Sequence, residues 1–311
     1  MSTFSPFVGM LLSIASTLYE FVPHPHFPGD ESAVFVVEGG EAFVYQLRER
    51  SDAGTMYALK VMKPIYRSEQ CVRVAAALVA HKDVPGLFLG HRLCLTKATA
   101  PGVIAAFPDL EYATLMPWLA SKTWAGVLSD ATASAAYTST KARSLAAATA
   151  NVLWYLEAHN LVHTDIAGGN ILVAPNYERV ELLDIEGLAT LTMPVPTWRS
   201  QGSPGYQHPK LDKRGQWRLE GDRFAGAILL TEMLTWWHPL VRAYTADDAE
   251  TLFAPDELQT SDFPRWYAVR DTLWHMNPTL LALFDQAWAS SDLAQCPPLS
   301  SWAMQLFATQ G

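Results

Sequence analysis

The chain has 311 residues, half of them hydrophobic, and a formal net charge of −9. This length suits one large domain or two medium ones, with enough apolar residues for a sizeable core. The acidic charge excludes nucleic acid and an anionic membrane as the main partners. Three widely spaced cysteines argue against a disulfide framework or a zinc site, and they favour a reducing compartment, the cytoplasm.

The N-terminal segment is predominantly apolar from Phe7 to Val22. It is too short to span a bilayer comfortably, and no basic segment precedes it. We therefore predict an N-terminal helix packed on the fold. The alternative, a signal sequence, is disfavoured because the basic region is missing.

Three short apolar stretches follow, separated by the glycine turn EGGEA and the polar turn RERSDAG. They cover residues 33–37, 42–47 and 56–62. This pattern predicts a three-stranded antiparallel meander. A helix is then expected over 68–81, and further strands are expected around Leu93 and over 113–116.

Long helical patterns dominate the rest of the chain, at 139–159, 222–236 and 278–289. The fold class is therefore α+β. A small antiparallel β-rich part, about 1–116 with the N-terminal helix, precedes a larger mainly helical part, about 117–311. Two parts joined by a short hinge are expected to form a cleft, which is a usual ligand site.

The segment LVHTDIAGGNILV, residues 161–173, places polar residues between two apolar runs. Polar residues in this position usually lie on a loop with rigid walls. His163, Asp165 and Asn170 have the spacing of a protein-kinase catalytic loop, HxDxxxxN. An apolar strand that ends in Asp184 follows.

Three further stretches occur in the order that kinases have them. YALKVMKP places Lys60 in a strand after a glycine turn, GSPGYQHP resembles the end of an activation segment, and GDRFAGAILLTEML resembles the central helix of the large lobe. The chain thus resembles the protein-kinase superfamily over nearly its full length. GGEAFVY, LMPWLASKTW and LAQCPPLSSW are similar to a group of bacterial serine/threonine-kinase-like proteins.

The resemblance implies one two-lobed kinase-like domain over 1–311, with ATP and Mg²⁺ as cofactors and a protein as substrate. It also implies metal-dependent protein phosphatases or von Willebrand-type domains as partners. Phosphoryl transfer needs a clamp on the triphosphate, a metal to absorb charge and a base that orients the hydroxyl. Asp165 is the expected base, Asn170 and Asp184 are the expected magnesium ligands, and Lys60 is expected to hold the α- and β-phosphates.

The same resemblance assigns the remaining nucleotide contacts. The backbone amides of Gly39 and Gly40 are expected to approach the phosphates, because glycine has no Cβ in the way. Met116 takes the gatekeeper position before the hinge. Pro117 offers adenine its carbonyl, since proline lacks an N–H, and Leu119 supplies the N–H.

Some positions depart from the family pattern. Val37 and Ala42 replace the first and third glycines of the phosphate loop. Thr164 stands where many kinases carry arginine, so we expect no requirement for activation-loop phosphorylation. Ala167 replaces a lysine typical of serine/threonine kinases, which weakens the assignment of a protein hydroxyl as substrate.

The helix after Lys60 carries no acid over 72–80, where kinases present a glutamate to the lysine. Glu69 lies early and Asp83 lies late. Either acid could serve, or Lys60 could pair with Asp184 directly.

Further expectations concern structural residues. Lys210 and Cys296 replace both members of a glutamate–arginine pair, which indicates a different structural solution there. His163 is expected to be a packed structural residue. Asp222 is expected to anchor the 163–165 backbone; the alternative is an acid that interacts only with the dipole of its helix.

Three functions remain open from the sequence. The first is an active ATP–Mg²⁺-dependent protein kinase, on the set Lys60, Asp165, Asn170 and Asp184. The second is a pseudokinase that binds nucleotide or acts as a scaffold, on the altered glycine turn and the missing helix acid. The third is a small-molecule kinase, because HxDxxxxN loops also occur in kinases of antibiotics and choline.

Overall fold

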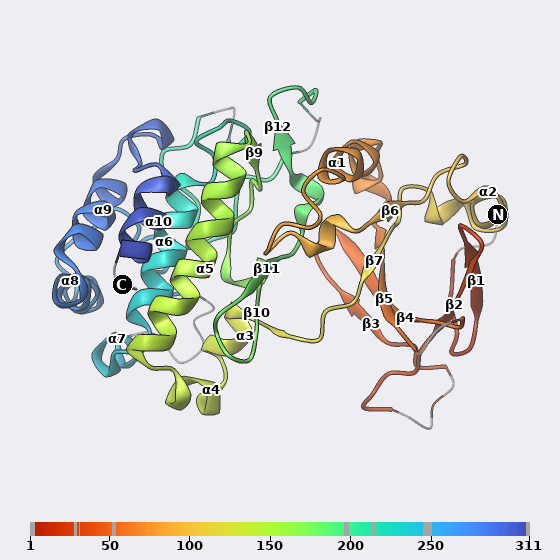
Figure 1. Cartoon of the computed structure of the whole chain (residues 1–311), viewed down its shortest axis with the longest axis horizontal. Helices are drawn as coiled ribbons and strands as arrows, with labels where there is room; N and C mark the ends of the chain where they lie inside the picture. Colours follow the sequence, from red (N-terminus) through yellow and green to blue (C-terminus); the bar gives the residue numbers. More distant parts are fainter. Residues whose placement is uncertain are drawn as a thin grey trace. The chain divides into compact units, whose positions relative to one another are not determined.

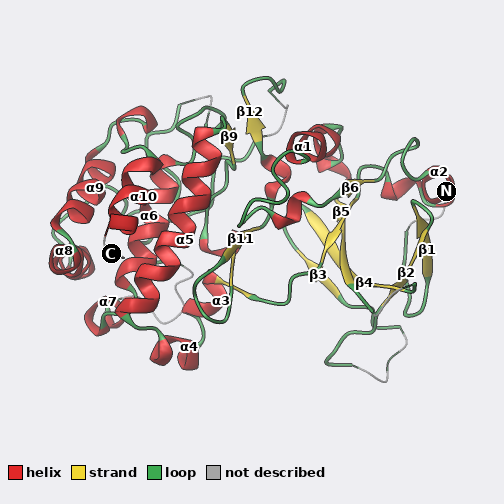
Figure 2. Cartoon of the chain, viewed as in Figure 1, coloured by secondary structure: helices red, strands yellow, loops and turns green. Residues whose placement is uncertain are grey.

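The structure is a computed structural model that describes residues 4–27, 30, 32–51, 54–195, 199–212, 215–244 and 251–308. The chain is α+β, as predicted, with strands concentrated in its first part and helices in its second (Figure 1, Figure 2). It divides into two units. Unit 1 comprises Met1–Val84 and Phe88–Ala120, and unit 2 comprises Pro85–Leu87 and Ser121–Gly311.

Unit 1 is built on a seven-stranded antiparallel sheet. Its strands are β1 (Leu11–Ile14), β2 (Thr17–Phe21), β3 (Val36–Glu38), β4 (Ala42–Glu49), β5 (Met56–Met62), β6 (Leu93–Cys94) and β7 (Thr114–Pro117). The order is β1-β2-β4-β5-β7-β6, and β3 also pairs with β4. The predicted meander is confirmed as β3–β4–β5, and both further strands are present.

The predicted N-terminal helix is wrong, because the apolar segment at 7–22 forms the β1–β2 hairpin. Leu12 and Ile14 are buried while the residues between and before them are exposed. This period of two marks a strand with one covered face. The two-residue turn has φ of 49° at Ala15 and 69° at Ser16, as in a type I′ hairpin turn. Neither residue announces that turn in the sequence, because asparagine and glycine are the usual signals.

The two faces of the sheet in unit 1 bury different cores. The larger core gathers alternate residues of β1, β2, β4 and β5 against α2 (Pro101–Ala106). On the other face Cys71 of α1 (Gln70–Leu78) packs with Met62 and Cys94. Lys60 lies two residues before Met62 on β5, so it shares the face that α1 covers.

Unit 2 is mainly helical. Its helices are α3 (Trp124–Leu128), α4 (Ala131–Ala136), α5 (Ser139–Ala158), α6 (Arg223–Thr235), α7 (Pro239–Ala243), α8 (Pro264–Met276), α9 (Pro278–Ala289) and α10 (Leu299–Ala308). The three long helical patterns predicted from the sequence are confirmed as α5, α6 and α9. α6 is buried from Phe224 to Thr235 and packs against α5 and α9.

A single carboxylate ties three of these helices together. Glu157 near the end of α5 accepts hydrogen bonds from Arg223 Nε (2.5 Å) and from the backbone N–H of Leu299 (2.9 Å).

In the described part of the chain, no helix is long and apolar enough to cross a membrane.

Short strands in unit 2 frame the predicted catalytic segment. They are β8 (Lys122–Thr123), β9 (Leu161–Val162), β10 (Ile171–Val173), β11 (Val180–Leu182) and β12 (Ala189–Thr190). β10 pairs with β8 and β11, and β9 pairs with β12. The 163–170 loop therefore starts from one small sheet and ends in another, which fixes both of its ends.

Candidate functional site

The 163–170 loop is anchored by a buried carboxylate. Asp222 Oδ2 accepts from the backbone N–H of His163 (2.6 Å), and Oδ1 accepts from that of Thr164 (2.9 Å). Asp222 is 3% exposed and makes no side-chain cap bond to α6. Burial raises its pKa, while His163 and the two N–H donors act in the opposite direction. The predicted anchoring role of Asp222 is confirmed. The alternative, an acid that interacts only with the dipole of its helix, is not supported.

The ring of His163 is a structural part of the loop, as predicted. It is fully buried, and its Nδ1 accepts from the backbone N–H of Asp165 (3.3 Å). Its Nε2 must then carry the proton, which it donates to the carbonyl of Leu183 (2.7 Å). Both nitrogens are thus engaged by the backbone on either side of the site.

The carboxylate of Asp165 is oriented by two side chains. Oδ1 accepts from Ser203 Oγ (2.8 Å), while Asn170 Nδ2 donates to the Asp165 carbonyl (2.8 Å) and lies 3.3 Å from Oδ2. Since the amide nitrogen of Asn170 is used in this way, its carbonyl oxygen remains an acceptor for a cation. The structure thus brings Asp165 and Asn170 together. Ser203 also contacts Asp165, although no role for Ser203 was predicted from the sequence.

A second backbone segment is tied to this loop. Asp184 follows β11 with φ of 52°, and Thr164 has φ of 70°. Thr164 Oγ1 donates to the carbonyl of Gly187 (3.1 Å), which joins the two segments. Non-glycine residues in the left-handed region are uncommon and concentrate at functional sites, where the surrounding structure holds them.

A buried glutamate on α6 is connected to the 163–170 loop through Tyr206. Glu232 Oε1 accepts from Trp124 Nε1 (2.6 Å) and Tyr206 Oη (2.8 Å), and Oε2 accepts from the backbone N–H of Leu252 (2.6 Å). Burial raises the pKa of Glu232 to about 7, although the three donors lower it. Tyr206 in turn contacts Gly168 of the loop, where an added Cβ would lie 2.9 Å from its hydroxyl. Sequence reasoning missed this network.

His208 takes part in a set of neutral hydrogen bonds near Lys210 and Cys296. His208 Nε2 lies 3.1 Å from Ser290 Oγ, and Cys296 Sγ donates to the same oxygen (3.3 Å). The backbone N–H of Lys210 donates to His208 Nδ1 (3.0 Å). Burial lowers the pKa of His208, which favours its neutral form. The hydrogen bonds among these residues thus need no buried charge.

In unit 1, Lys60 lies in the middle of β5 and is only 5% exposed. The residues that α1 buries are Gln70, Cys71, Val74 and Leu78, none of them acidic. Glu69 pairs with Arg73 (3.0 Å), and Asp83 pairs with His91 (3.0 Å), both near the surface. Each of the two acids proposed from the sequence thus has a partner other than Lys60.

Gly39 and Gly40, in the glycine turn between β3 and β4, are exposed. The Gly39 N–H donates to the Ala42 carbonyl (2.9 Å), so the hairpin itself uses one of the two amides expected at the phosphates. A Cβ on Gly40 would meet no atom within 4 Å. Beside the turn, Lys63 pairs with Glu38 (2.9 Å).

The expected adenine-contacting residues follow one another at the end of β7. Met116 lies opposite Ala58 of β5, and Pro117 is the last residue of the strand. The Trp118 N–H donates to the Met56 carbonyl (3.0 Å), which continues the pairing by one residue. Leu119 lies just beyond, outside the strand.

The predicted site residues are divided between the two units. Unit 1 carries Gly39, Gly40, Lys60, Met116, Pro117 and Leu119, and unit 2 carries Asp165, Asn170 and Asp184. Among the described residues, no group of three or more histidine, cysteine or acidic side chains could hold a metal ion.

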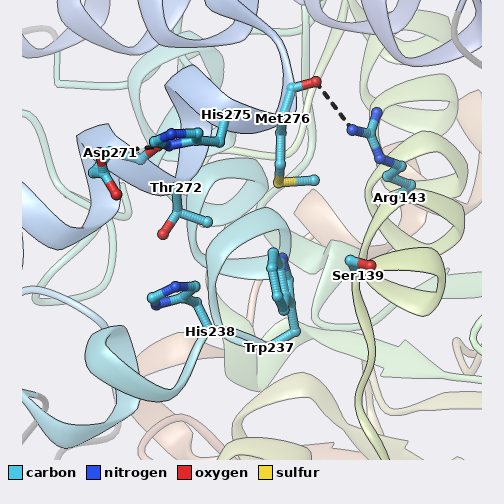
Figure 3. A pocket seen from close by; sticks show the side chains of 8 residues that line it. All are labelled: Ser139, Arg143, Trp237, His238, Asp271, Thr272, His275 and Met276. Atoms are coloured by element: carbon cyan, nitrogen blue, oxygen red, sulfur yellow. Dashed lines mark hydrogen bonds and ion pairs between the residues drawn. The ribbon is translucent and has the colours of Figure 1, made fainter.

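Unit 2 also contains a pocket of about 280 Å³ that is unrelated to these residues (Figure 3). It is lined by Ser139, Arg143, Trp237, His238, Asp271, Thr272, His275 and Met276. Arg143 Nη2 donates to the Met276 carbonyl (3.0 Å) across it, and His275 pairs with Asp271 (3.4 Å). Its mixture of basic, acidic and apolar groups favours no particular ligand.

Comparison with protein-family models gives no match, and comparison with curated proteins gives none either.

Proposed function

We propose that the chain is an ATP- and Mg²⁺-dependent phosphotransferase with the two-lobed fold of protein kinases, acting on a serine or threonine hydroxyl of a protein. One observation carries this proposal: the carboxylate of Asp165 is held by Ser203 and Asn170 on a loop that Asp222 anchors. A base for phosphoryl transfer must be positioned before the hydroxyl arrives, because positioning supplies most of the catalysis in this reaction.

Asp165 is the proposed base. Its Oδ1 is held by a hydroxyl donor and its Oδ2 lies beside an amide donor, so both oxygens remain acceptors in fixed directions. A carboxylate in this state can accept the proton of an incoming alcohol.

Asn170 and Asp184 are the proposed magnesium ligands. The orientation of the Asn170 amide fits this role, because its nitrogen is turned toward Asp165 and its oxygen is left for the ion. When bound, ATP–Mg²⁺ would supply the transferable phosphoryl group and the charge that stabilises its transfer. Lys60 would hold the α- and β-phosphates, and Pro117 and Leu119 would contact adenine.

The proposed enzyme does not require phosphorylation of its activation loop. Thr164, at the position of the family's arginine, is 2% exposed and donates its hydroxyl to Gly187. It therefore offers no cation to a phosphate. Replacing Thr190 and Thr192 by alanine should leave activity unchanged, and a loss of activity from removing any phosphosite between Asp184 and Pro209 would contradict this.

A pseudokinase is the second candidate, favoured by the buried face of α1. That face has no acid, and one amide of the glycine turn is already used by the hairpin. In this form the chain would bind nucleotide or partners, such as a metal-dependent phosphatase or a von Willebrand-type domain, without transferring phosphate. A small-molecule kinase is less favoured, because Ser203 in the segment 202–209 contacts Asp165 and such enzymes lack that segment.

The test measures transfer of phosphate from radiolabelled ATP with Mg²⁺, to the chain itself and to proteins of a lysate. Asp165→Asn should reduce the rate by about 10²–10⁴-fold, the usual contribution of a positioned base. Ser203→Ala should reduce it less, and Asp271→Asn, at an exposed site on α8, should not reduce it. The thermal midpoint of each variant checks that it is folded.

Nucleotide binding separates the candidates. Binding to the folded state must raise the thermal midpoint when ATP and Mg²⁺ are added. A raised midpoint without any Asp165-dependent transfer would replace the kinase with a nucleotide-binding pseudokinase. Transfer to a small alcohol but to no protein would identify a small-molecule kinase.

A further inference from the structure

The N-terminal hairpin has no part in the proposed chemistry, yet it exposes an apolar strand. From Phe7 to Leu18 the sequence has no charged residue, and β1 is the last strand of its sheet (Figure 1). No described strand pairs with the outer edge of β1. Proteins usually protect such edges with charges or proline, and β1 carries neither.

The backbone groups that face outward can be identified from the register. In an antiparallel pair, successive residues alternate between facing the neighbouring strand and facing away. The Phe21 N–H donates to the Met10 carbonyl (3.0 Å), and Ile14 and Thr17 flank the two-residue turn. The backbone N–H and C=O groups of residues 10, 12 and 14 therefore point toward β2. The N–H and C=O groups of residues 11 and 13 point outward, and both residues are exposed.

We propose that the β1 edge of a second copy of this chain pairs with this edge in antiparallel orientation, so that the two sheets join across a twofold axis at Leu12. In this register Leu11 of one copy lies opposite Ser13 of the other. Each of these two pairs can exchange two N–H···O=C hydrogen bonds, because both residues direct their polar groups outward. The contact is self-complementary, as a twofold contact must be.

The side chains and charges beside this edge suit a second copy. Leu11, Ser13 and Leu18 share one exposed face, since Ser13 lies opposite Leu18 in the hairpin. Like charge would oppose self-association of a chain with net charge −9. At the hairpin, however, Glu20 pairs with Arg48 (2.9 Å) and Arg50 (3.0 Å), so the local charge is not acidic.

The contact is small. Pairing of two four-residue strands buries much less than the roughly 1,200–2,000 Å² of a stable standard interface. The dimer is therefore weak and forms at high protein concentration.

Sedimentation velocity over a wide range of concentration tests the proposal. The unmodified chain should shift from monomer to dimer. Leu11→Lys places like charges on both sides of the joint, and Ser13→Pro removes an outward N–H without touching the hairpin's own bonds. Each should raise the dissociation constant by about tenfold or more. Ile65→Lys, which changes another exposed aliphatic side chain outside the sheet, should leave it unchanged.

Oxidative cross-linking tests the register. The double variant Leu11→Cys/Ser13→Cys places thiols opposite each other across the axis, at about the 5.5 Å Cα separation that a disulfide accepts. Either single variant separates the two thiols by more than the roughly 7 Å limit, and the three native cysteines are buried. The double variant alone should form a covalent dimer.

Three outcomes would overturn the proposal. They are a chain that stays monomeric at every concentration, a dimer that Leu11→Lys and Ser13→Pro leave intact, and equal cross-linking of the single and double variants.

Discussion

The 163–170 loop and the glycine turn at 38–42 are both short polar connections, but they are held very differently. The loop is fixed from several sides, by Asp222 on its backbone, by Leu183 on its histidine and by Ser203 on its aspartate. In the turn, the Gly39 N–H donates to the Ala42 carbonyl of its own hairpin, and residues 38–40 are exposed.

The difference shows where fixed geometry is needed. On the proposed function, a base and a metal ligand would need one fixed orientation, which the contacts of the loop supply. A segment that covers phosphates would instead adjust when the ligand binds, so few contacts would be enough. Substitutions that disturb the contacts of the loop should therefore lower stability more than substitutions in the turn, and the following predictions test this contrast.

The largest effect is expected at the anchor of the loop. Asp222→Ala leaves the N–H groups of His163 and Thr164 buried without an acceptor, at about 1–3 kcal/mol each. The free energy of unfolding should fall by about 2–6 kcal/mol in urea denaturation, and phosphate transfer should be lost. Asp271→Ala, at an exposed acid, should change stability by less than about 0.5 kcal/mol. Equal effects of the two substitutions would contradict the anchoring role.

The buried Glu232 should make stability depend on pH. Its folded-state pKa of about 7 lies above its usual value of 4.5, so between these values the folded state keeps a proton that the unfolded state releases. Stability from this group therefore falls as the pH rises through that window, by an amount on the order of 3 kcal/mol.

Glu232→Gln removes this titration while other groups keep theirs. The variant is less stable throughout. Only the amide oxygen of glutamine can accept, so the donor at the other position, Trp124 or Leu252, faces an NH2 group. The difference in unfolding free energy between the unmodified chain and the variant should be larger at pH 5 than at pH 8. A difference that does not vary with pH would show that Glu232 is ionised throughout.

Two adjacent glycines of the loop provide a matched pair. Gly168→Ala would place a Cβ 2.9 Å from Tyr206 Oη and 3.1 Å from Trp124 Cδ1, whereas Gly169→Ala meets nothing within 4 Å. The first should cost about 1–3 kcal/mol of stability and the second close to nothing. Thermal unfolding of both variants checks this, and similar midpoints would mean that Tyr206 does not support the loop.

A small effect is also expected in the glycine turn. Gly40→Ala meets no atom within 4 Å, and this glycine does not have the positive φ that would exclude alanine. Stability should change by less than about 1 kcal/mol. Titration with ATP measures how far the turn takes part in binding. A loss of stability as large as that of Gly168→Ala would remove the contrast between loop and turn.

Local patterns predicted much of the fold. The meander at β3–β5 was predictable because glycine and polar turns separate short apolar runs, and α5, α6 and α9 were predictable from their helical periodicity. The N-terminal hairpin was not, because a continuous apolar run fits either a helix or a strand. Its turn, Ala15–Ser16, also lacks the residues that usually mark a hairpin.

The candidate site was predictable where one short motif contains the residues. Asp165 and Asn170 lie five residues apart, and the structure joins them directly. Glu232 and Tyr206 were missed because their partners come from distant parts of the chain and depend on tertiary packing. Ser203 belongs to a segment that was noticed, but its contact with Asp165 spans 38 residues.

The anchoring of the loop by Asp222 has a consequence for exchange with heavy water. The amides of His163 and Thr164 lie outside any helix or strand, and such amides usually exchange quickly. Here both donate to a carboxylate that begins α6, the buried central helix of unit 2. Deuterium can reach them only when that helix start separates from the loop, so these two amides should exchange as slowly as those of the core helices and report the opening of the whole unit.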